Sequence, residues 1–346
     1  METAQLIPNS SAIIPGNPKG EEQVSDLIRR GLDIANSVSL IFEDPELEMA
    51  VREAIDKPVG PILPTDVSYL SNLSVTRKNI RSLEGLGELF SLRSFLAMGN
   101  RISGIKALEN LYNLQELNLS HNLIKKLNAL GELKDLRKLH LGRNAISKTE
   151  PLAGLTNLRE LVLSYNAIQD IEALETLSNL EELHLIGNEI HDISVLAKLK
   201  KLRVLSLSRN QISDLSALAG LVNLEKLWLG NNQIEDLSPL VRLKNLRLLH
   251  LGSNRISEIG FLRRLYQITD LDLSDNRISD LKDLTSLTNL QVLLLSQNQI
   301  REVQDLWELP NLTIVELSKN PISLVPNSEA VRVITWLVRG GCLVKV

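Results

Sequence analysis

Leucine and isoleucine recur in a fixed pattern, LxxLxLxxNxIxxIxxLxxL, that repeats every 22 residues over most of the chain. Before each asparagine, apolar positions alternate with variable ones, as at Leu161 and Leu163, and a period of two predicts a short strand with one buried face. After the asparagine the apolar spacing becomes three, as at Ile168, Ile171 and Leu174, which aligns these side chains on one side of a 3₁₀ helix. Each unit is therefore expected to be a short strand followed by a 3₁₀ or irregular segment.

A fixed period of this length is typical of a solenoid, in which each unit buries its apolar face only against its neighbours. About twelve units over residues 71–322 should stack their strands in parallel. Segments as thin as 3₁₀ turns on the outer side should curve the stack only gently. The pattern thus predicts an α/β leucine-rich repeat solenoid with one curved parallel β-sheet, a 3₁₀ or irregular convex side, and capped ends.

The asparagine of each unit has a structural explanation. The chain turns inward there, and an amide side chain offers both donors and an acceptor to backbone groups that the turn leaves buried. We therefore expect a structural ladder with no catalytic role. The eleven asparagines are Asn100, Asn122, Asn144, Asn166, Asn188, Asn210, Asn232, Asn254, Asn276, Asn298 and Asn320.

The two ends of the array should be covered by caps, because a terminal unit would otherwise expose apolar surface. Residues 21–70 are expected to form a helical N-terminal cap, with Asp44 as the N-cap of one helix, Pro45 as its first residue, and a second short helix over residues 64–70. Residues 323–346 should form a short C-terminal cap, with a helix over residues 328–338 and a final edge strand. Residues 1–20 contain Ser, Asn, Gly and Pro without periodicity, which predicts disorder.

Residues 41–322 resemble the N-terminal cap and repeats of bacterial internalin-like leucine-rich repeat proteins. The caps of that family look like DPxLxxAVxxAL, then KPxGxI, then a TxxDL-type turn. The matching residues are Asp44-Pro45, Leu47, Ala50-Val51, Ala54-Ile55, Lys57-Pro58, Gly60 and Thr65-Asp66-Val67. The resemblance implies recognition of another molecule. Eukaryotic regulators of protein phosphatase 1 have similar 22-residue repeats, but their Tyr- and Arg-containing C-terminal cap has no counterpart here.

Composition narrows the function classes. The net charge is −4, spread along the chain, and only 3% of residues are aromatic, which is unfavourable for nucleic-acid binding. No apolar run is long enough to insert in a membrane. The first 30 residues lack the basic start and apolar core of a secretory signal, and Cys342 is the only cysteine. Localisation therefore stays open between a secreted or surface protein, as the resemblance allows, and a cytoplasmic one.

The best candidates for function lie on the predicted concave face, where the core does not dictate residue identity. The column four places before each asparagine collects three of the five histidines and one of the three tryptophans. Trp, Tyr and Arg are enriched at binding hot spots, although a tryptophan here could also simply shield strand backbone. The partner-binding candidates are Trp228, His250, His184, His140, Tyr165, Arg143, Arg209 and Asp272. Histidines with an unperturbed pKa of about 6.5 should make binding vary between about pH 5.5 and 7.5.

Catalytic and metal chemistry are not expected. His140 and His184 should lie about 9–10 Å apart at strand spacing, too far to share a zinc ion with ligand distances of about 2 Å. Asp270, Asp272 and Asp275 form an acidic spot that is interpreted as solvated charge. A phosphate-binding loop and a GxSxG motif are both missing, and the repeat pattern places no orienting acid beside a Ser206–His184 pair. We expect no cofactor.

Two features of the turn that follows each strand are also expected to have structural roles. Asp170, Asp192, Asp214, Asp236 and Asp280 share the position four after the asparagine and should accept local backbone N–H bonds. Thr149 replaces an Ile or Leu and is expected to distort its turn.

The sequence as a whole favours a non-catalytic module, expected to be a monomer, that binds a protein, or a glycan, through its concave face. The alternatives are an intracellular scaffold or phosphatase regulator, and a structural module of a larger surface protein.

Overall fold

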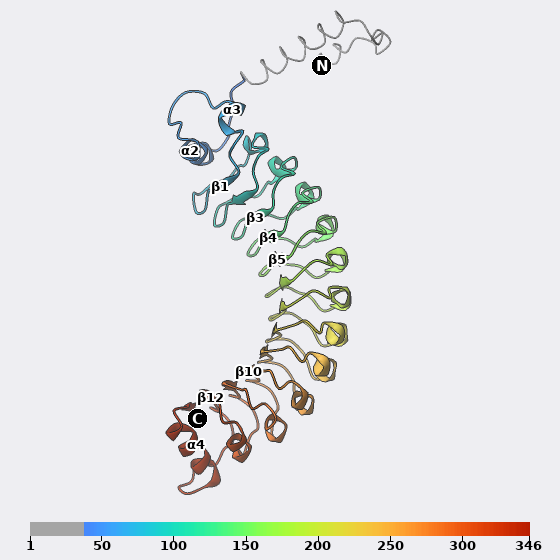
Figure 1. Ribbon diagram of the computed structural model, residues 1–346, viewed down its shortest axis with the longest axis vertical. Helices are drawn as coiled ribbons and strands as arrows, with labels where there is room; N and C mark the ends of the chain where they lie inside the picture. Colours follow the sequence, from blue (N-terminus) through green and yellow to red (C-terminus); the bar gives the residue numbers. More distant parts are fainter. Residues whose placement is uncertain (1–37) are drawn as a thin grey trace, which may run out of the picture.

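The computed structural model describes residues 38–346, which form one curved solenoid with its strands along the inner side of the arc (Figure 1). Thirteen parallel strands make a single open sheet in chain order, which confirms the predicted fold class. The strands are β1 Asn72–Ser74, β2 Ser94–Leu96, β3 Glu116–Asn118, β4 Lys138–His140, β5 Glu160–Val162, β6 Glu182–His184, β7 Val204–Ser206, β8 Lys226–Trp228, β9 Leu248–His250, β10 Asp270–Asp272, β11 Val292–Leu294, β12 Ile314–Glu316 and β13 Leu343–Lys345.

Each strand is only three residues long, and the period-two pattern determines which of them is buried. In β6 and β7 the central residues Leu183 and Leu205 are fully buried, and they pair with each other in register. The residues on either side, such as Glu182 and His184, point to the inner surface of the arc. The register advances by one whole repeat per strand, so residues 22 positions apart lie side by side along the sheet.

The convex side consists of short 3₁₀ helices, as the period of three predicts. Between β1 and β12, all of which the structure describes, no α-helix occurs. The 3₁₀ helices are η1 Leu86–Glu88, η2 Lys106–Leu108, η3 Asn128–Leu130, η4 Glu150–Leu152, η5 Glu172–Thr176, η6 Ser194–Lys198, η7 Ser216–Gly220, η8 Ser238–Arg242, η9 Gly260–Arg264, η10 Lys282–Leu284 and η11 Gln304–Glu308. Because each of these segments buries a leucine against the sheet, leucine and isoleucine form one continuous core along the arc.

The asparagines bind backbone groups of adjacent repeats. The amide nitrogen of Asn210 donates to the carbonyl of Leu207 at 2.9 Å and to that of Leu185, one repeat back, at 3.0 Å. Its amide oxygen accepts the backbone N–H of Ile190 at 3.1 Å. The same contacts recur from Asn100 to Asn320, so each side chain links two successive turns.

Thr149 does not distort its turn, so that prediction is wrong. Its backbone angles (φ −107°, ψ −7°) are close to those of Leu127 at the same position of the preceding repeat (φ −109°, ψ 6°). The buried hydroxyl donates to the carbonyl oxygen of Asp170 at 3.2 Å, which satisfies the polar atom that replaces the usual methyl group.

Between residue 38 and the first strand lie two helices, α2 Pro45–Ala54 and α3 Pro64–Val67, and α2 packs against β1. Asp44 is the N-cap of α2, as predicted, because one carboxylate oxygen accepts the N–H of Glu46 at 3.0 Å. Its other oxygen accepts the N–H of Arg81 at 2.7 Å, so the same side chain joins the helix to the first repeat. Gly85 lies against the Ile41 carbonyl and Phe42 with φ +95°, where a Cβ has no room.

At the other end, α4 Glu329–Arg339 packs against η11 and β13. The Ser328 hydroxyl accepts the N–H of Val331 at 3.4 Å as the helix N-cap, and Val333 and Leu337 are buried. Trp336 of α4 lies 4.9 Å from Trp307 of η11, measured between ring centroids. The helix thus covers the last repeat, and β13 forms the end of the sheet.

The predictions of a disordered segment over residues 1–20, and of a cap that starts at residue 21, fall wholly or partly on residues 1–37, which lie outside the described residues.

Candidate functional site

The inner surface of the arc carries the predicted binding residues on strands β4 to β10 and on the turns that follow them. The last residue of each strand forms the central row, and the residue just before each ladder asparagine forms a second row. That second row has positive φ at Arg143, Tyr165 and Arg209, at 55°, 59° and 58°. A left-handed residue in each turn sends the chain from the strand toward the partly buried asparagine, so these side chains stay outside the core.

His140 pairs with an acidic residue of the next strand. Its Nε2 atom lies 2.7 Å from Oε1 of Glu160, and the other oxygen of that carboxylate lies 3.6 Å from Nζ of Lys138. Glu160 thus contacts both a histidine and a lysine of the preceding strand, which ties β4 to β5 on the concave face.

His184 and Ser206 are in contact, with Nδ1 and Oγ 3.0 Å apart. The nearest acid is Glu182, whose Oε2 is 3.9 Å from Nε2 of His184. This distance is too long for the hydrogen bond that would orient a catalytic imidazole. Ser206 is also 2% exposed, so its hydroxyl has no open path to a substrate. The contact fixes the orientation of the histidine on the concave face.

Trp228 packs on His250 of the next strand. The two ring centroids lie 6.1 Å apart with the planes at 83°, an edge-to-face arrangement that aromatic pairs favour. Trp228 is half-buried at the end of β8 and does not enter the leucine core, whose contribution from this strand is Leu227. The ring is therefore held in place and still accessible.

Arg143 and Tyr165 form a second aromatic contact on the adjacent row. The guanidinium carbon of Arg143 lies 4.5 Å from the centroid of the Tyr165 ring, within the range of a cation–π interaction. The same ring lies against Gly187 of the next repeat, where φ is +68° and a Cβ would come within 2.7 Å of the tyrosine. Tyr165, 41% exposed, is thus positioned by three successive repeats.

The remaining two candidates stand apart from these contacts. The Asp272 carboxylate accepts the N–H of Ser274 at 2.9 Å and leans over Gly252, and Arg209 belongs to the turn after β7. The structure therefore brings two pairs of candidates together, Trp228 with His250 and Arg143 with Tyr165. The candidates His184 and His140 instead contact Ser206 and Glu160. In the part of the chain from residue 38 onward, no group of three or more His, Cys, Asp or Glu side chains is arranged to hold a metal ion.

Burial changes the expected pH response. Burial lowers the pKa of His184 below its ordinary value, against the opposing effect of Glu182 and Glu160. Burial likewise lowers the pKa of His250, against Asp272 and Asp270. The expectation that both histidines titrate near 6.5 is therefore wrong, because neighbouring repeats desolvate the imidazolium form. Any response of these two groups shifts to pH values below 6.5.

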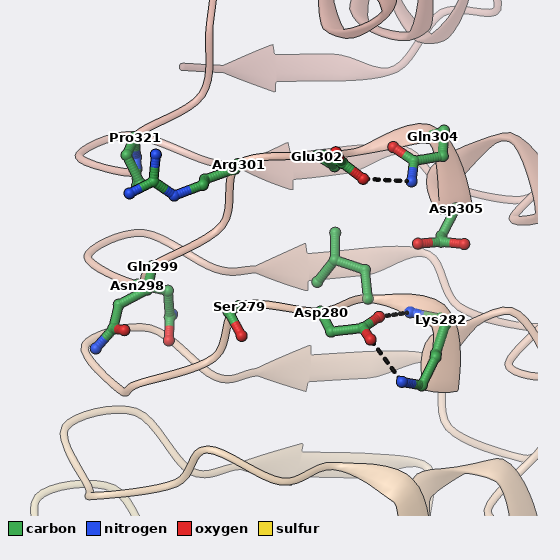
Figure 2. A pocket seen from close by; sticks show the side chains of 11 residues that line it. Ser279, Asp280, Lys282, Asn298, Gln299, Arg301, Glu302, Gln304, Asp305 and Pro321 are labelled. Carbon is green, nitrogen blue, oxygen red and sulfur yellow. Dashed lines mark hydrogen bonds and ion pairs between the residues drawn. The ribbon is translucent and has the colours of Figure 1, made fainter.

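The flank of the solenoid, between the asparagine turns and the 3₁₀ helices, also carries hollows. One of about 690 Å³, shown in Figure 2, lies between the repeats that end in η10 and η11. Asp280 accepts both the backbone N–H and the ammonium group of Lys282, at 2.9 and 2.6 Å. Burial raises the pKa of Asp305, with smaller contributions from Asp280 and Glu302. This hollow is acidic, and its charges are partly paired within the protein.

Sequence reasoning missed a second row of asparagines at the outer edge of the repeats. Each donates its amide N–H to a backbone carbonyl 23 residues earlier, for example Asn223 to Lys200 at 2.9 Å. The sequence signal is an asparagine nine places before the ladder asparagine. The row consists of Asn113, Asn157, Asn179, Asn223, Asn245, Asn289 and Asn311.

Comparison with known proteins identifies the repeats. The model for "Leucine Rich repeats (2 copies)" matches residues 90–132, 112–154, 134–176, 156–198, 200–242 and 244–286, and a second leucine-rich repeat model matches residues 267–322. No curated protein sequence matches the chain significantly.

Solved structures show the same fold. The internalin InlF of Listeria monocytogenes is 30% identical with a TM-score of 0.77, and the match covers 88% of this chain and 95% of that one. The functional domain of InlJ from the same organism is 24% identical (TM-score 0.76, 82% and 62% covered). The ectodomain of an Arabidopsis thaliana receptor kinase, in complex with Casparian strip integrity factor 2, is 26% identical (TM-score 0.65), over 74% of this chain and 34% of that one.

Proteins of this fold family serve as protein-binding modules and are typically non-catalytic. No helix within residues 38–346 combines the length and apolar character needed to cross a bilayer. The matches over most of the repeats, and the similarity to InlF along almost its whole length, establish that the chain belongs to the leucine-rich repeat proteins and is internalin-like.

Proposed function

We propose that this chain is a non-catalytic module that binds a protein partner through the concave face of β4 to β10. The observation that carries the proposal is the Trp228–His250 pair, a large aromatic ring held by its neighbour outside the leucine core. Aromatic side chains that are fixed before binding lose little conformational entropy when a partner covers them. Trp228 is thus suited to be an anchor residue of the interface.

The other pairs support the same surface. The contact of Arg143 with Tyr165 and that of His184 with Ser206 each hold a side chain that no core position requires. Together with Trp228 they extend across neighbouring strands of one face, as a partner that follows the arc would need.

The test is selection of peptide binders against the immobilised full chain, followed by affinity measurement on variants. Trp228→Ala should weaken the selected binders at least tenfold, since a buried aromatic anchor contributes about 2 kcal/mol or more. The matched control is Tyr266→Ala, which removes an aromatic ring that is 48% exposed and lies away from the strands. If Trp228→Ala leaves the affinity of the binders unchanged and Tyr266→Ala lowers it, the binding site lies on another surface.

A further inference from the structure

One position on the flank changes its chemistry along the array. It lies four residues after each ladder asparagine from Asn100 to Asn298, and it is neutral or basic in the first three of these repeats and acidic in the next seven. The column reads Gly104, Lys126, Lys148, Asp170, Asp192, Asp214, Asp236, Glu258, Asp280 and Glu302. Each of the five aspartates accepts a hydrogen bond from the backbone N–H two residues later, at 2.7–2.9 Å, and so stabilises its own turn. The lysines at the start of the column, Lys126 and Lys148, cannot accept such a hydrogen bond.

A hollow of about 640 Å³ lies on this basic part of the flank, between the repeats that end in η2 and η3. We call it the basic flank hollow. Its volume falls within the range of about 300–1,000 Å³ that is common for ligand sites. Its lining combines lysines with apolar side chains. The lining residues are Ser103, Gly104, Ile105, Lys106, Glu109, Leu123, Lys125, Lys126, Asn128 and Ala129.

The apolar part of this hollow is open to solvent. Leu123 is 57% exposed, although most leucines of the repeats are fully buried. Ile105 is buried beneath, and Ala129 packs partly against the core. Gly104 has open space where a side chain would lie, which leaves the entrance wide. An aliphatic side chain from another molecule could therefore be covered here.

The charged part of the hollow is not compensated. Lys106, Lys125 and Lys126 are all exposed, and within residues 38–346 none of them forms an ion pair. Glu109 is the single acid of the lining. In the acidic hollow of Figure 2, by contrast, Asp280 pairs with Lys282. Positive charge around an apolar floor thus distinguishes the N-terminal hollow.

We infer that the basic flank hollow binds an acidic segment of a protein partner, with carboxylates on Lys106, Lys125 and Lys126 and an aliphatic side chain on Leu123. The charge of the lysines selects an acidic segment, and the exposed leucine selects a peptide over an inorganic anion. The site lies on the flank and not on the concave face, so it is a second contact surface beyond the one proposed above.

The experiment uses fluorescence polarisation with the full chain and a labelled peptide in which a leucine is surrounded by glutamates. Lys125→Glu with Lys126→Glu should weaken binding at least tenfold and remove the loss of affinity with rising salt, because repulsion replaces attraction. The matched control is Lys200→Glu with Lys244→Glu, which makes the same charge change at exposed lysines elsewhere and should alter affinity less than twofold. Leu123→Ser, and a peptide with serine in place of its leucine, should each weaken binding about threefold or more at constant charge.

Any of four results would overturn the inference. The first two are no binding of the peptide by wild type at low salt, and an equal loss of peptide affinity in the control variant. The others are equal competition for the site by a DNA oligonucleotide or a sulfated glycan, and a salt-sensitive dimer in sedimentation velocity that the Lys125→Glu, Lys126→Glu variant loses. The last would assign the hollow to a second copy of this chain. Trp228→Ala should leave peptide affinity unchanged, so failure of the concave-face proposal would be recognised separately.

Discussion

The turn interior and the concave face of each repeat follow different rules. At the interior turn, asparagine recurs in every repeat from Asn100 to Asn320, because buried N–H and C=O groups need an amide at that place. On the concave face the last strand residue is a valine in β5, a serine in β7 and a tryptophan in β8. The strand backbone is already paired along the sheet there, so the fold leaves residue identity free. Uniform positions therefore report stability, and variable ones are free to carry the recognition proposed above.

The largest effect is expected when the N-terminal helices that cover the end of the leucine core are removed. Deleting residues 1–70 should expose the apolar edge of the first repeats, remove the hydrogen bond from Arg81 to Asp44, and cause aggregation or loss of cooperative folding. Light scattering and thermal unfolding measure the outcome. A truncated array that stays monomeric and cooperative would show that the N-terminal helices are not a cap.

Two adjacent residues of β8 allow the same comparison between core and concave face within a single strand. Leu227→Ala should lower the free energy of unfolding by about 2–5 kcal/mol, because it leaves a cavity in the continuous core. Trp228→Ala should change it by less than about 1 kcal/mol, since the ring lies outside that core. Urea unfolding of both variants checks the pair, and similar losses would mean that Trp228 is a structural residue.

The two asparagine rows both form hydrogen bonds to backbone groups, but the ladder asparagines do so inside the turn and the outer row does so at an exposed edge. Asn210→Ala should cost about 1–3 kcal/mol, because carbonyls of two repeats and the N–H of Ile190 lose a partner away from water. Asn223→Ala, at an exposed position of the outer row, should cost about 0.5 kcal/mol, because water replaces the amide. Equal unfolding midpoints for the two variants would contradict the structural reading of the ladder.

The smallest expected effect comes from pH. Since burial lowers the pKa of His184, the folded state binds a proton less readily than the unfolded state, whose histidine titrates near 6.5. The contribution of this group is complete above pH 6.5 and is lost as the pH falls through the lower, folded-state pKa. His184→Gln should therefore flatten the decline in stability below pH 6.5 and leave stability above it nearly unchanged. Thermal unfolding between pH 5 and 8 measures this, and an identical slope in the variant would contradict it.

The sequence by itself determined the repeat, its strand and 3₁₀ segments, the Asn ladder and the N-cap at Asp44, because short-range periodicity and local hydrogen bonding specify each of them. Stacking at a fixed register then also placed residues 22 apart side by side, so the rows on the concave face were predictable.

Only the tertiary structure decided which members of those rows touch. Side-chain contacts between repeats depend on rotamers and on small neighbours: Tyr165 lies flat because Gly187 leaves room, and His184 turns toward Ser206 and not toward His140. The lowered pKa values of His184 and His250 also arise from burial by adjacent repeats. The satisfied hydroxyl of Thr149 needed the carbonyl of Asp170 from the next repeat, a partner that no local pattern reveals.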